Sequence, residues 1–181
     1  MIGPRFPTVL RTAQDGDERA VGELFAAYDP ALRRYLEGRA GGSGDDIAQE
    51  VWIAAARNLR TFEGDEGAFR AWLFSIARSK VVDHRRKAAR RPSTPVDPRE
   101  LAFRAGSHPP PAPLAVLDAI AELVDGLTEE QTDIVLLRVV GGFSVEEVAN
   151  LLGKRAGTVR VAQHRALRKL AGKMASGTVT P

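Results

Sequence analysis

Basic residues, which can bind a polyanion, gather near the C-terminal end of the chain. Seven Lys and Arg residues and no acid fall between Lys154 and Lys173. Such residues neutralise phosphates, and Arg can also hold O6 and N7 of guanine together. If Val159, Ala166 and Leu170 face inward at helical spacing, the outward face consists of Arg160, Val161, His164, Arg165 and Arg168.

This basic segment is predicted to bind nucleic acid. Lysines near the helix ends, Lys154, Lys169 and Lys173, are better placed for phosphates than for bases. The alternative is a helical hairpin with a solvated basic face, but such a face usually interleaves acids with its bases. No second His or carboxylate lies at ligand spacing from His164, which disfavours a metal site.

A second basic cluster precedes the middle of the chain. Seven bases and a single acid, Asp83, lie between Arg78 and Arg91, and the aromatic residues Phe69 and Trp72 come shortly before them. Aromatic and basic side chains together can hold single-stranded DNA by stacking and charge. Both aromatic residues also have the spacing of a helix core, which is the simpler explanation for them.

An acidic patch marks a third candidate surface, formed by Asp45, Asp46, Gln49 and Glu50. No His accompanies these carboxylates, so acid-base catalysis and metal binding are disfavoured. The patch lies opposite the apolar residues Ile47 and Val51 of one amphipathic helix. A protein-docking surface is favoured, with a solvated face as the alternative.

The strongest local structural signal is a helix-turn-helix that would position the C-terminal bases. Thr128 with Gln131, and Ser144 with Glu147, match capping boxes, which predict two helix starts. Phe143 and Val148 are spaced as a hydrophobic staple around the second start. A short helix over residues 145–152 then meets the basic helix across Gly153, with the small Ala149 and the apolar Val159 at the positions that the motif requires.

The N-terminal half also predicts helices. Phe25, Tyr28, Leu32, Tyr35 and Leu36 recur at helical steps across Pro30, which indicates one kinked helix or two segments. Ser43 is predicted to cap the acidic helix. A loop is expected over residues 63–67, followed by a helix over residues 68–90 whose inner face includes Leu73 and Ala77.

Composition fits an all-α protein of two small domains. Hydrophobic residues make up 44% of the 181-residue chain, and it contains no Cys, which excludes disulfides and thiolate metal sites. Seven prolines between Arg91 and Pro113 indicate a flexible linker over residues 92–113. We therefore expect independent helical domains over residues 1–91 and 114–181, a cytoplasmic location, no membrane insertion and no cofactor.

Three sequence runs, taken in order, carry a resemblance to a known family. They are DDIAQEVW from Asp45 to Trp52, FRAWLFSIAR from Phe69 to Arg78, and GTVR from Gly157 to Arg160 followed by His164-Arg165-Ala166. Together they resemble the extracytoplasmic-function (ECF) group of bacterial sigma factors. The resemblance implies a protein that binds core RNA polymerase and directs promoter recognition, DNA melting and transcription initiation.

The resemblance also implies roles for individual residues. The polymerase clamp would be bound by Asp45, Asp46, Gln49 and Glu50, and the flap region would be a further contact. The loop from Phe62 to Gly67 and the basic helix would bind the −10 element, through Phe62, Arg78, Ser79, Lys80, Arg85 and Arg86. The −35 element would be bound by Lys154, Arg155, Thr158, Arg160, Val161, His164, Arg165 and Arg168. An anti-sigma factor is a further expected partner.

Departures from the family pattern concern promoter sequence. Ser79 stands where relatives often carry Asn, and Val161-Ala162 replace a frequent Ser-Arg pair. A stand-alone helix-turn-helix regulator is the alternative function, but it leaves the second basic cluster unexplained. An enzyme is disfavoured because neither a metal-binding carboxylate cluster nor a phosphate loop is apparent.

Overall fold

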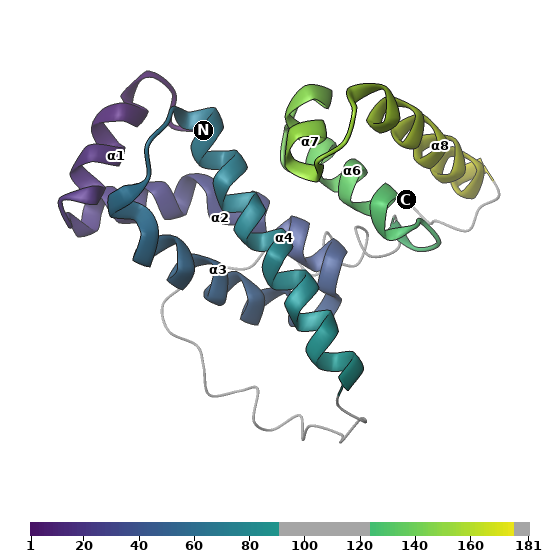
Figure 1. Cartoon of the computed structure of the whole chain (residues 1–181), viewed down its shortest axis with the longest axis horizontal. Coiled ribbons are helices and arrows are strands. Elements are labelled where there is room, and N and C mark those ends of the chain that lie inside the picture. Colours follow the sequence, from purple (N-terminus) through teal and green to yellow (C-terminus); the bar gives the residue numbers. More distant parts are fainter. Residues whose placement is uncertain (91–123, 176–181) are drawn as a thin grey trace.

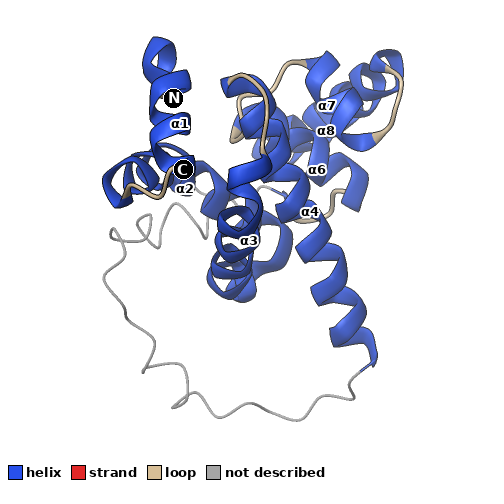
Figure 2. Cartoon of the chain, turned by 60° about the vertical axis from the view of Figure 1, so that its left-hand side comes forward, coloured by secondary structure: helices blue, strands red, loops and turns tan. Residues whose placement is uncertain are grey.

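The computed structural model describes residues 1–90 and 124–175, and within these ranges it contains helices and no strand (Figures 1 and 2). The expected all-α fold is therefore confirmed. The first unit comprises α1 (Phe6–Gln14), α2 (Glu18–Ala40), α3 (Gly44–Asn58) and α4 (Glu66–Arg90). The second comprises α6 (Glu129–Val139), α7 (Val145–Leu152) and α8 (Ala156–Ala175). The expected linker over residues 92–113 lies outside the described residues.

The central helix of the first unit is α2, which packs against α1, α3 and α4. It runs as one continuous helix through Pro30, so the sequence alternative of two separate segments is wrong. Its buried stripe includes Leu32, Tyr35 and Leu36, each at 0% exposure. The long α4 lies across α2 and α3 and buries Phe69, Leu73, Phe74, Ala77 and Val81.

Two helix starts differ from the sequence prediction. Ser43 directly precedes α3 but makes no side-chain capping bond. Its φ of −93° and ψ of 1° differ from the extended backbone of a capping residue, because a 3-10 turn (Gly41–Ser43) leads straight into the helix. The helix α4 begins at Glu66 rather than Ala68, since Asp65 Oδ1 accepts the Ala68 N–H at 2.7 Å and shortens the loop.

The predicted helix-turn-helix is confirmed in its local geometry. Both capping boxes are present, with Ser144 Oγ accepting the Glu147 N–H at 3.1 Å and the Ser144 N–H donating to Glu147 Oε2 at 2.6 Å. The turn residue Gly153 has φ 63° and ψ 37°, the left-handed conformation expected there. Ala149 and Val159 are buried at 4% and 0% exposure, which fixes the crossing of α7 and α8.

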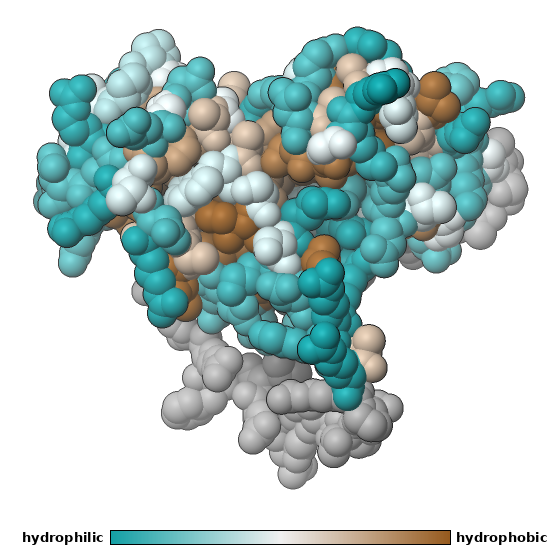
Figure 3. All heavy atoms as spheres, in the orientation of Figure 1, coloured by the Kyte–Doolittle hydropathy of each residue, from teal (hydrophilic) through white to brown (hydrophobic). Residues whose placement is uncertain are grey.

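Buried residues of the two units meet in one hydrophobic cluster. Buried residues of α2, α3 and α4 form one cluster with Ile134, Leu136, Phe143 and Val148 of the second unit. Figure 3 shows apolar surface in the middle of the molecule, whereas the end of α4 is hydrophilic. A separate, smaller cluster of Val135, Ala166 and Leu170 joins α6 to α8.

Candidate polymerase- and DNA-binding surfaces

The C-terminal basic face lies on α8, the second helix of the helix-turn-helix. Val159, Ala166 and Leu170 turn inward as predicted, with exposed fractions of 0%, 0% and 6%. The remaining candidate residues of this segment are exposed, namely Arg155, Thr158, Arg160, Val161, His164, Arg165 and Arg168, together with Lys154 in the preceding turn. Sequence periodicity therefore identified the outward face correctly.

Two residues of this basic face are paired with acids of their own unit. Arg160 Nη2 lies 2.6 Å from Glu146 Oε1, and Lys154 Nζ lies 3.0 Å from Glu130 Oε1. Both pairs are solvent-exposed, so each contributes little to stability and can be exchanged for a phosphate or a base at small cost. The face therefore remains available for contact with a duplex.

The acidic face of α3 presents Asp46 and Glu50 to solvent, with Gln49 half-buried between them. Glu50 Oε2 accepts a hydrogen bond from Lys80 Nζ at 3.0 Å. Asp45 forms an ion pair with Arg33 at the start of the helix. The four predicted polymerase-binding residues thus occupy one helix, but only Asp46 and Glu50 present largely exposed carboxylates without a link to α2.

A buried carboxylate positions this acidic face relative to α2. Asp29 is 1% exposed, and its oxygens accept hydrogen bonds from Trp52 Nε1 at 2.9 Å and Arg33 Nε at 2.7 Å. A buried carboxylate needs such partners. Because Asp29 belongs to α2 and Trp52 to α3, the bond between them fixes the crossing of the two helices and holds the acidic face outward.

An aromatic cluster lies where the loop after α3 enters α4. The Phe62 ring lies 5.0 Å from the Trp72 ring and 5.4 Å from the Phe69 ring. Phe69 is 1% exposed and belongs to the core, as the simpler sequence explanation had it. Phe62 and Trp72 are half-buried, so parts of both rings face the surface beside the loop.

Some of the −10 residues predicted on α4 are exposed, and others bind acidic or carbonyl groups of the protein. Ser79 and Arg86 are exposed. Lys80 binds Glu50 of α3, while Arg78 Nε donates to Asp133 Oδ2 of the second unit at 3.4 Å. Arg85 donates to the Arg39 carbonyl at 2.7 Å and pairs with Glu129 at 2.5 Å. Arg78 and Arg85 are therefore turned toward the second unit.

Sequence reasoning missed the polar cluster around Asp133, a residue of α6 that is 5% exposed. Asp133 Oδ1 accepts the Tyr35 hydroxyl at 2.9 Å and forms an ion pair with Arg39 Nε at 2.7 Å. Burial, together with the adjacent Asp133 carboxylate, raises the pKa of Tyr35, so its hydroxyl stays protonated and donates. An acid inside the apolar run of α6 was the available signal, because buried acids are almost always paired.

A second missed contact joins α4 to the start of the helix-turn-helix. The Arg70 guanidinium lies 4.4 Å from the centre of the Phe143 ring, and its Nη2 lies 2.9 Å from Glu147 Oε1. Phe74 meets the same ring edge-on at 5.2 Å. Burial alone would raise the pKa of Glu147, but hydrogen bonds from Ser144 and the charge of Arg70 outweigh it and lower that pKa.

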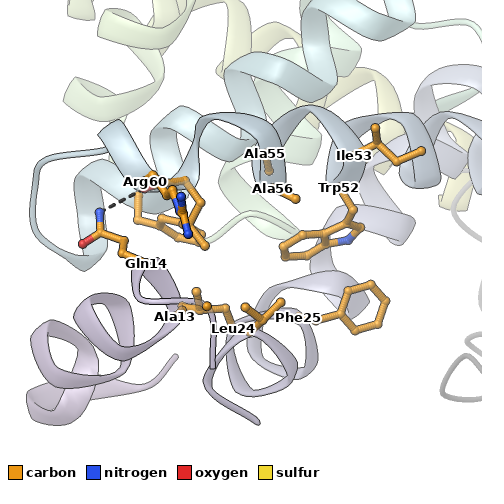
Figure 4. A pocket seen from close by; sticks show the side chains of 13 residues that line it. Ala13, Gln14, Leu24, Phe25, Trp52, Ile53, Ala55, Ala56 and Arg60 are labelled. Atoms are coloured by element: carbon orange, nitrogen blue, oxygen red, sulfur yellow. Dashed lines mark hydrogen bonds between the residues drawn. The ribbon is translucent and has the colours of Figure 1, made fainter. Parts of the chain in front are cut away.

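An apolar groove of about 480 Å³ lies between α1, α2 and α3 (Figure 4). Its floor includes Leu24 and Ala55, and Phe25 and Trp52 line one end with their rings 4.9 Å apart. At the other end Gln14 donates hydrogen bonds to the backbone oxygens of Leu59 and Phe62. The groove carries no constellation of reactive groups.

Metal-binding clusters and membrane-spanning helices are both absent from the part of the chain that the structure describes. No group of three or more His, Cys, Asp or Glu residues there is arranged to hold a metal ion. None of the described helices is long and apolar enough to cross a membrane.

Comparison with known families gives two matches in chain order. Residues 24–91 match the model described as Sigma-70 region 2, and residues 117–170 match Sigma-70, region 4. The first match covers most of α2 together with α3 and α4, and the second covers α6, α7 and most of α8. Both candidate DNA-binding faces thus fall within matched segments.

Curated relatives and solved structures extend these matches to nearly the whole chain. The ECF RNA polymerase sigma factor SigD of Mycobacterium tuberculosis (strain H37Rv) is 36% identical, over 94% of this chain and 84% of its own. The ECF RNA polymerase sigma-E factor of Escherichia coli K12 is 31% identical, over 92% of each. The structure of CnrH in complex with the cytosolic domain of CnrY has a TM-score of 0.67 at 25% identity, covering 94% of this chain and 97% of that one.

Proposed function

The chain belongs to the ECF RNA polymerase sigma factors. From this membership we propose which of its surfaces binds core polymerase and which bind the two promoter elements. As a sigma factor it binds core RNA polymerase and directs promoter recognition and transcription initiation. The stand-alone helix-turn-helix regulator is not favoured, because the match to region 2 accounts for the first unit as well.

The acidic face of α3 docks on core polymerase in this proposal. Its Asp46 and Glu50 carboxylates are exposed, and Gln49 lies between them. Complementary charge steers protein association and fixes its register. The buried Asp29 contacts hold this face at a set angle to α2, so docking would not require rearrangement of the helix.

The −10 element binds along the loop from Phe62 to Gly67 and the basic side of α4. Partly exposed Phe62 and Trp72 rings offer stacking surfaces for unpaired bases, and Arg78, Ser79, Lys80, Arg85 and Arg86 follow along the same helix. Stacking combined with basic side chains is how proteins hold single-stranded DNA.

The −35 element binds in duplex form against α8, the second helix of the helix-turn-helix. The single observation that carries this assignment is the exposed face of Arg155, Arg160, Arg165 and Arg168, in a segment without any acid. Arg160 and Arg165 lie in the first half of α8, the part that enters the major groove most deeply in this motif.

We also propose two properties that follow from family membership more than from geometry. The protein acts as a non-catalytic factor in the compartment that holds RNA polymerase. An anti-sigma factor is the partner expected for the family, and the structurally similar CnrH forms a complex with the cytosolic domain of CnrY.

Transcription in vitro tests the proposal. Purified chain and core polymerase would be mixed with a library of genomic fragments, and transcripts would be sequenced. We expect transcripts that start at sites sharing two upstream motifs and that depend on the chain. Duplex binding by the chain, without transcripts from any fragment, would instead support the regulator.

A further inference from the structure

The most unexpected feature is that acids of the second unit occupy the basic face of the first. At the start of α6, Glu129 and Asp133 point toward Arg39 of α2 and toward Arg78 and Arg85 of α4. We call these five residues, with Tyr35, the interdomain polar cluster. Two of its arginines belong to the set assigned above to the −10 strand.

The centre of the cluster is shielded from water. The Asp133 side chain is 7% exposed and the Arg39 side chain 3%, with Asp133 Oδ1 and Arg39 Nε 2.7 Å apart. Tyr35 donates its hydroxyl to the same carboxylate oxygen at 2.9 Å. Both groups lose their water when the units meet, and their attraction offsets that loss only while both are present, so substitution of either partner would destabilise the closed arrangement.

The rim of the cluster is exposed and exchangeable. The Arg85 side chain is 37% exposed and that of Glu129 75%, and Arg78 is 42% exposed where it meets Asp133. Carboxylates here occupy the places beside arginines that phosphates of a DNA strand would take, since both are anions that accept guanidinium hydrogen bonds. A bound strand must therefore compete with Glu129 and Asp133.

The start of α4 also faces the second unit. A cavity of about 550 Å³ is lined by Ala71, Trp72 and Ser75 of α4 on one side and by Asn150 and Leu151 of α7 on the other. Phe143 packs edge-on against Phe74 beside it. The helix α7 thus faces Trp72, one ring of the aromatic cluster, across this cavity.

The duplex-reading face is left open in the same arrangement. Arg165, Arg168 and Val161 are exposed, and Arg160 is paired, among the described residues, with Glu146 of its own unit. One DNA-binding surface is covered and the other is accessible.

We propose that this contact between the two units is an autoinhibitory latch. The closed chain binds duplex DNA through α8 but keeps single-stranded DNA away from α4 until the units separate. The latch rests on the −10 assignment of α4 made above, and it adds an order of events in which unit separation precedes strand capture.

Adjacent glutamates provide a matched pair of variants for the test. Glu129 faces Arg85 of the first unit, whereas Glu130 faces Lys154 of its own unit. Glu129→Gln and Glu130→Gln remove the same charge one residue apart, in exposed positions of the first turn of α6. Any difference between them reports on the latch and not on net charge. Asp133→Asn probes the buried centre.

The chain contains no Cys, so dyes on Arg57→Cys and Ala171→Cys, two exposed positions, would report the distance between the units. Binding of a fluorescent oligo(dT) and of a double-stranded oligonucleotide would be measured by anisotropy. We expect Glu129→Gln to bind oligo(dT) about two- to fivefold more tightly than Glu130→Gln, with lower energy transfer. Asp133→Asn should gain about tenfold, with duplex binding unchanged.

Outcomes that overturn the latch are distinct from those that overturn the proposed function. Equal oligo(dT) binding by both glutamine variants would refute it, as would separated units without a gain in oligo(dT) binding. Circular dichroism would show whether Asp133→Asn is folded, and Glu129→Gln decides the matter if it is not. Failure of the wild-type chain to support transcription by core polymerase would count against the proposed function, whatever the state of the latch.

Discussion

Charge reversal on the acidic face of α3 gives a direct test of polymerase docking. We predict that the double variant Asp46→Arg/Glu50→Arg remains folded but binds core RNA polymerase much more weakly. Both side chains are exposed, and the opposite side of the helix, where Ile47 and Val51 are 2% and 0% exposed, is unchanged. The perturbation therefore acts on the surface and leaves the core intact.

The expected loss of stability is small. Asp46 lies in the first turn of α3, where a carboxylate gains about 0.3 to 1 kcal/mol from the helix dipole. Glu50 and Lys80 form a pair whose side chains are 50% and 33% exposed, and solvent limits such pairs to about 0.2 to 1 kcal/mol. Their sum of at most about 2 kcal/mol is well below the total stability of about 5 to 15 kcal/mol that is usual for a domain.

The expected loss of binding is larger, because each reversal replaces an attraction with a repulsion at a protein interface. Like charges brought together at an interface cost several kcal/mol. For two partly hydrated positions we expect a total of about 2 to 4 kcal/mol, which corresponds to a Kd increased about 30- to 1000-fold.

The assay would measure Kd on immobilised core polymerase, with urea unfolding as the check on folding. A control with the same change of charge is Asp15→Arg/Glu18→Arg, two exposed acids at the turn between α1 and α2, with Glu18 in a first helical turn like Asp46. Unchanged affinity of the folded α3 variant, or an equal loss in the control, would refute the docking assignment.

Three further predictions concern the second unit. Arg165→Ala should weaken binding to the upstream duplex by about 1 to 3 kcal/mol and relax one base preference if the residue reads guanine; a uniform loss with a flatter salt dependence would mean that it holds phosphate. Because the pKa of Glu147 is lowered, its charge stabilises the fold above the ordinary value of 4.5, and this contribution disappears as pH falls through the lowered pKa. The melting temperatures of wild type and Glu147→Gln should therefore differ at pH 7 and converge in acid, and a constant difference would contradict this. Gly153→Ala should lower the free energy of unfolding in urea by about 1 to 2 kcal/mol, because alanine is strained in the left-handed conformation and no atom lies within 4 Å of the added Cβ. As a control, Gly157→Ala within α8 should raise the free energy of unfolding by about 0.5 to 1 kcal/mol.

Local features of the fold were predictable because each depends on neighbouring residues. The two capping boxes, the left-handed Gly153 and the inward turn of Val159 all follow from spacing within one or two helical turns. Ser43 shows the limit of such reasoning, since a preceding 3-10 turn set its backbone and prevented the cap.

The arrangement of the two units was not predictable in the same way, although the chain contains a signal for it. The run from Ile134 to Leu137 is buried at every position, so α6 is covered on more than one side. A helix that packed only within its own small unit would need a single apolar stripe. Spacing could identify Arg78 and Arg85 as basic surface residues, but it could not show that Asp133 and Glu129 lie beside them, because that pairing joins segments separated by the linker.

Phe143 connects the start of α7 to α4. It precedes Ser144 at the start of α7, and it is also the ring against which Phe74 and Arg70 of α4 pack. Separation of the units would strip one side of this ring and remove the Arg70 partner of Glu147. The amide protons of α7 should then exchange with solvent faster, even though α7 keeps its own hydrogen bonds. The rigidity of the helix-turn-helix therefore depends on whether the second unit lies against α4.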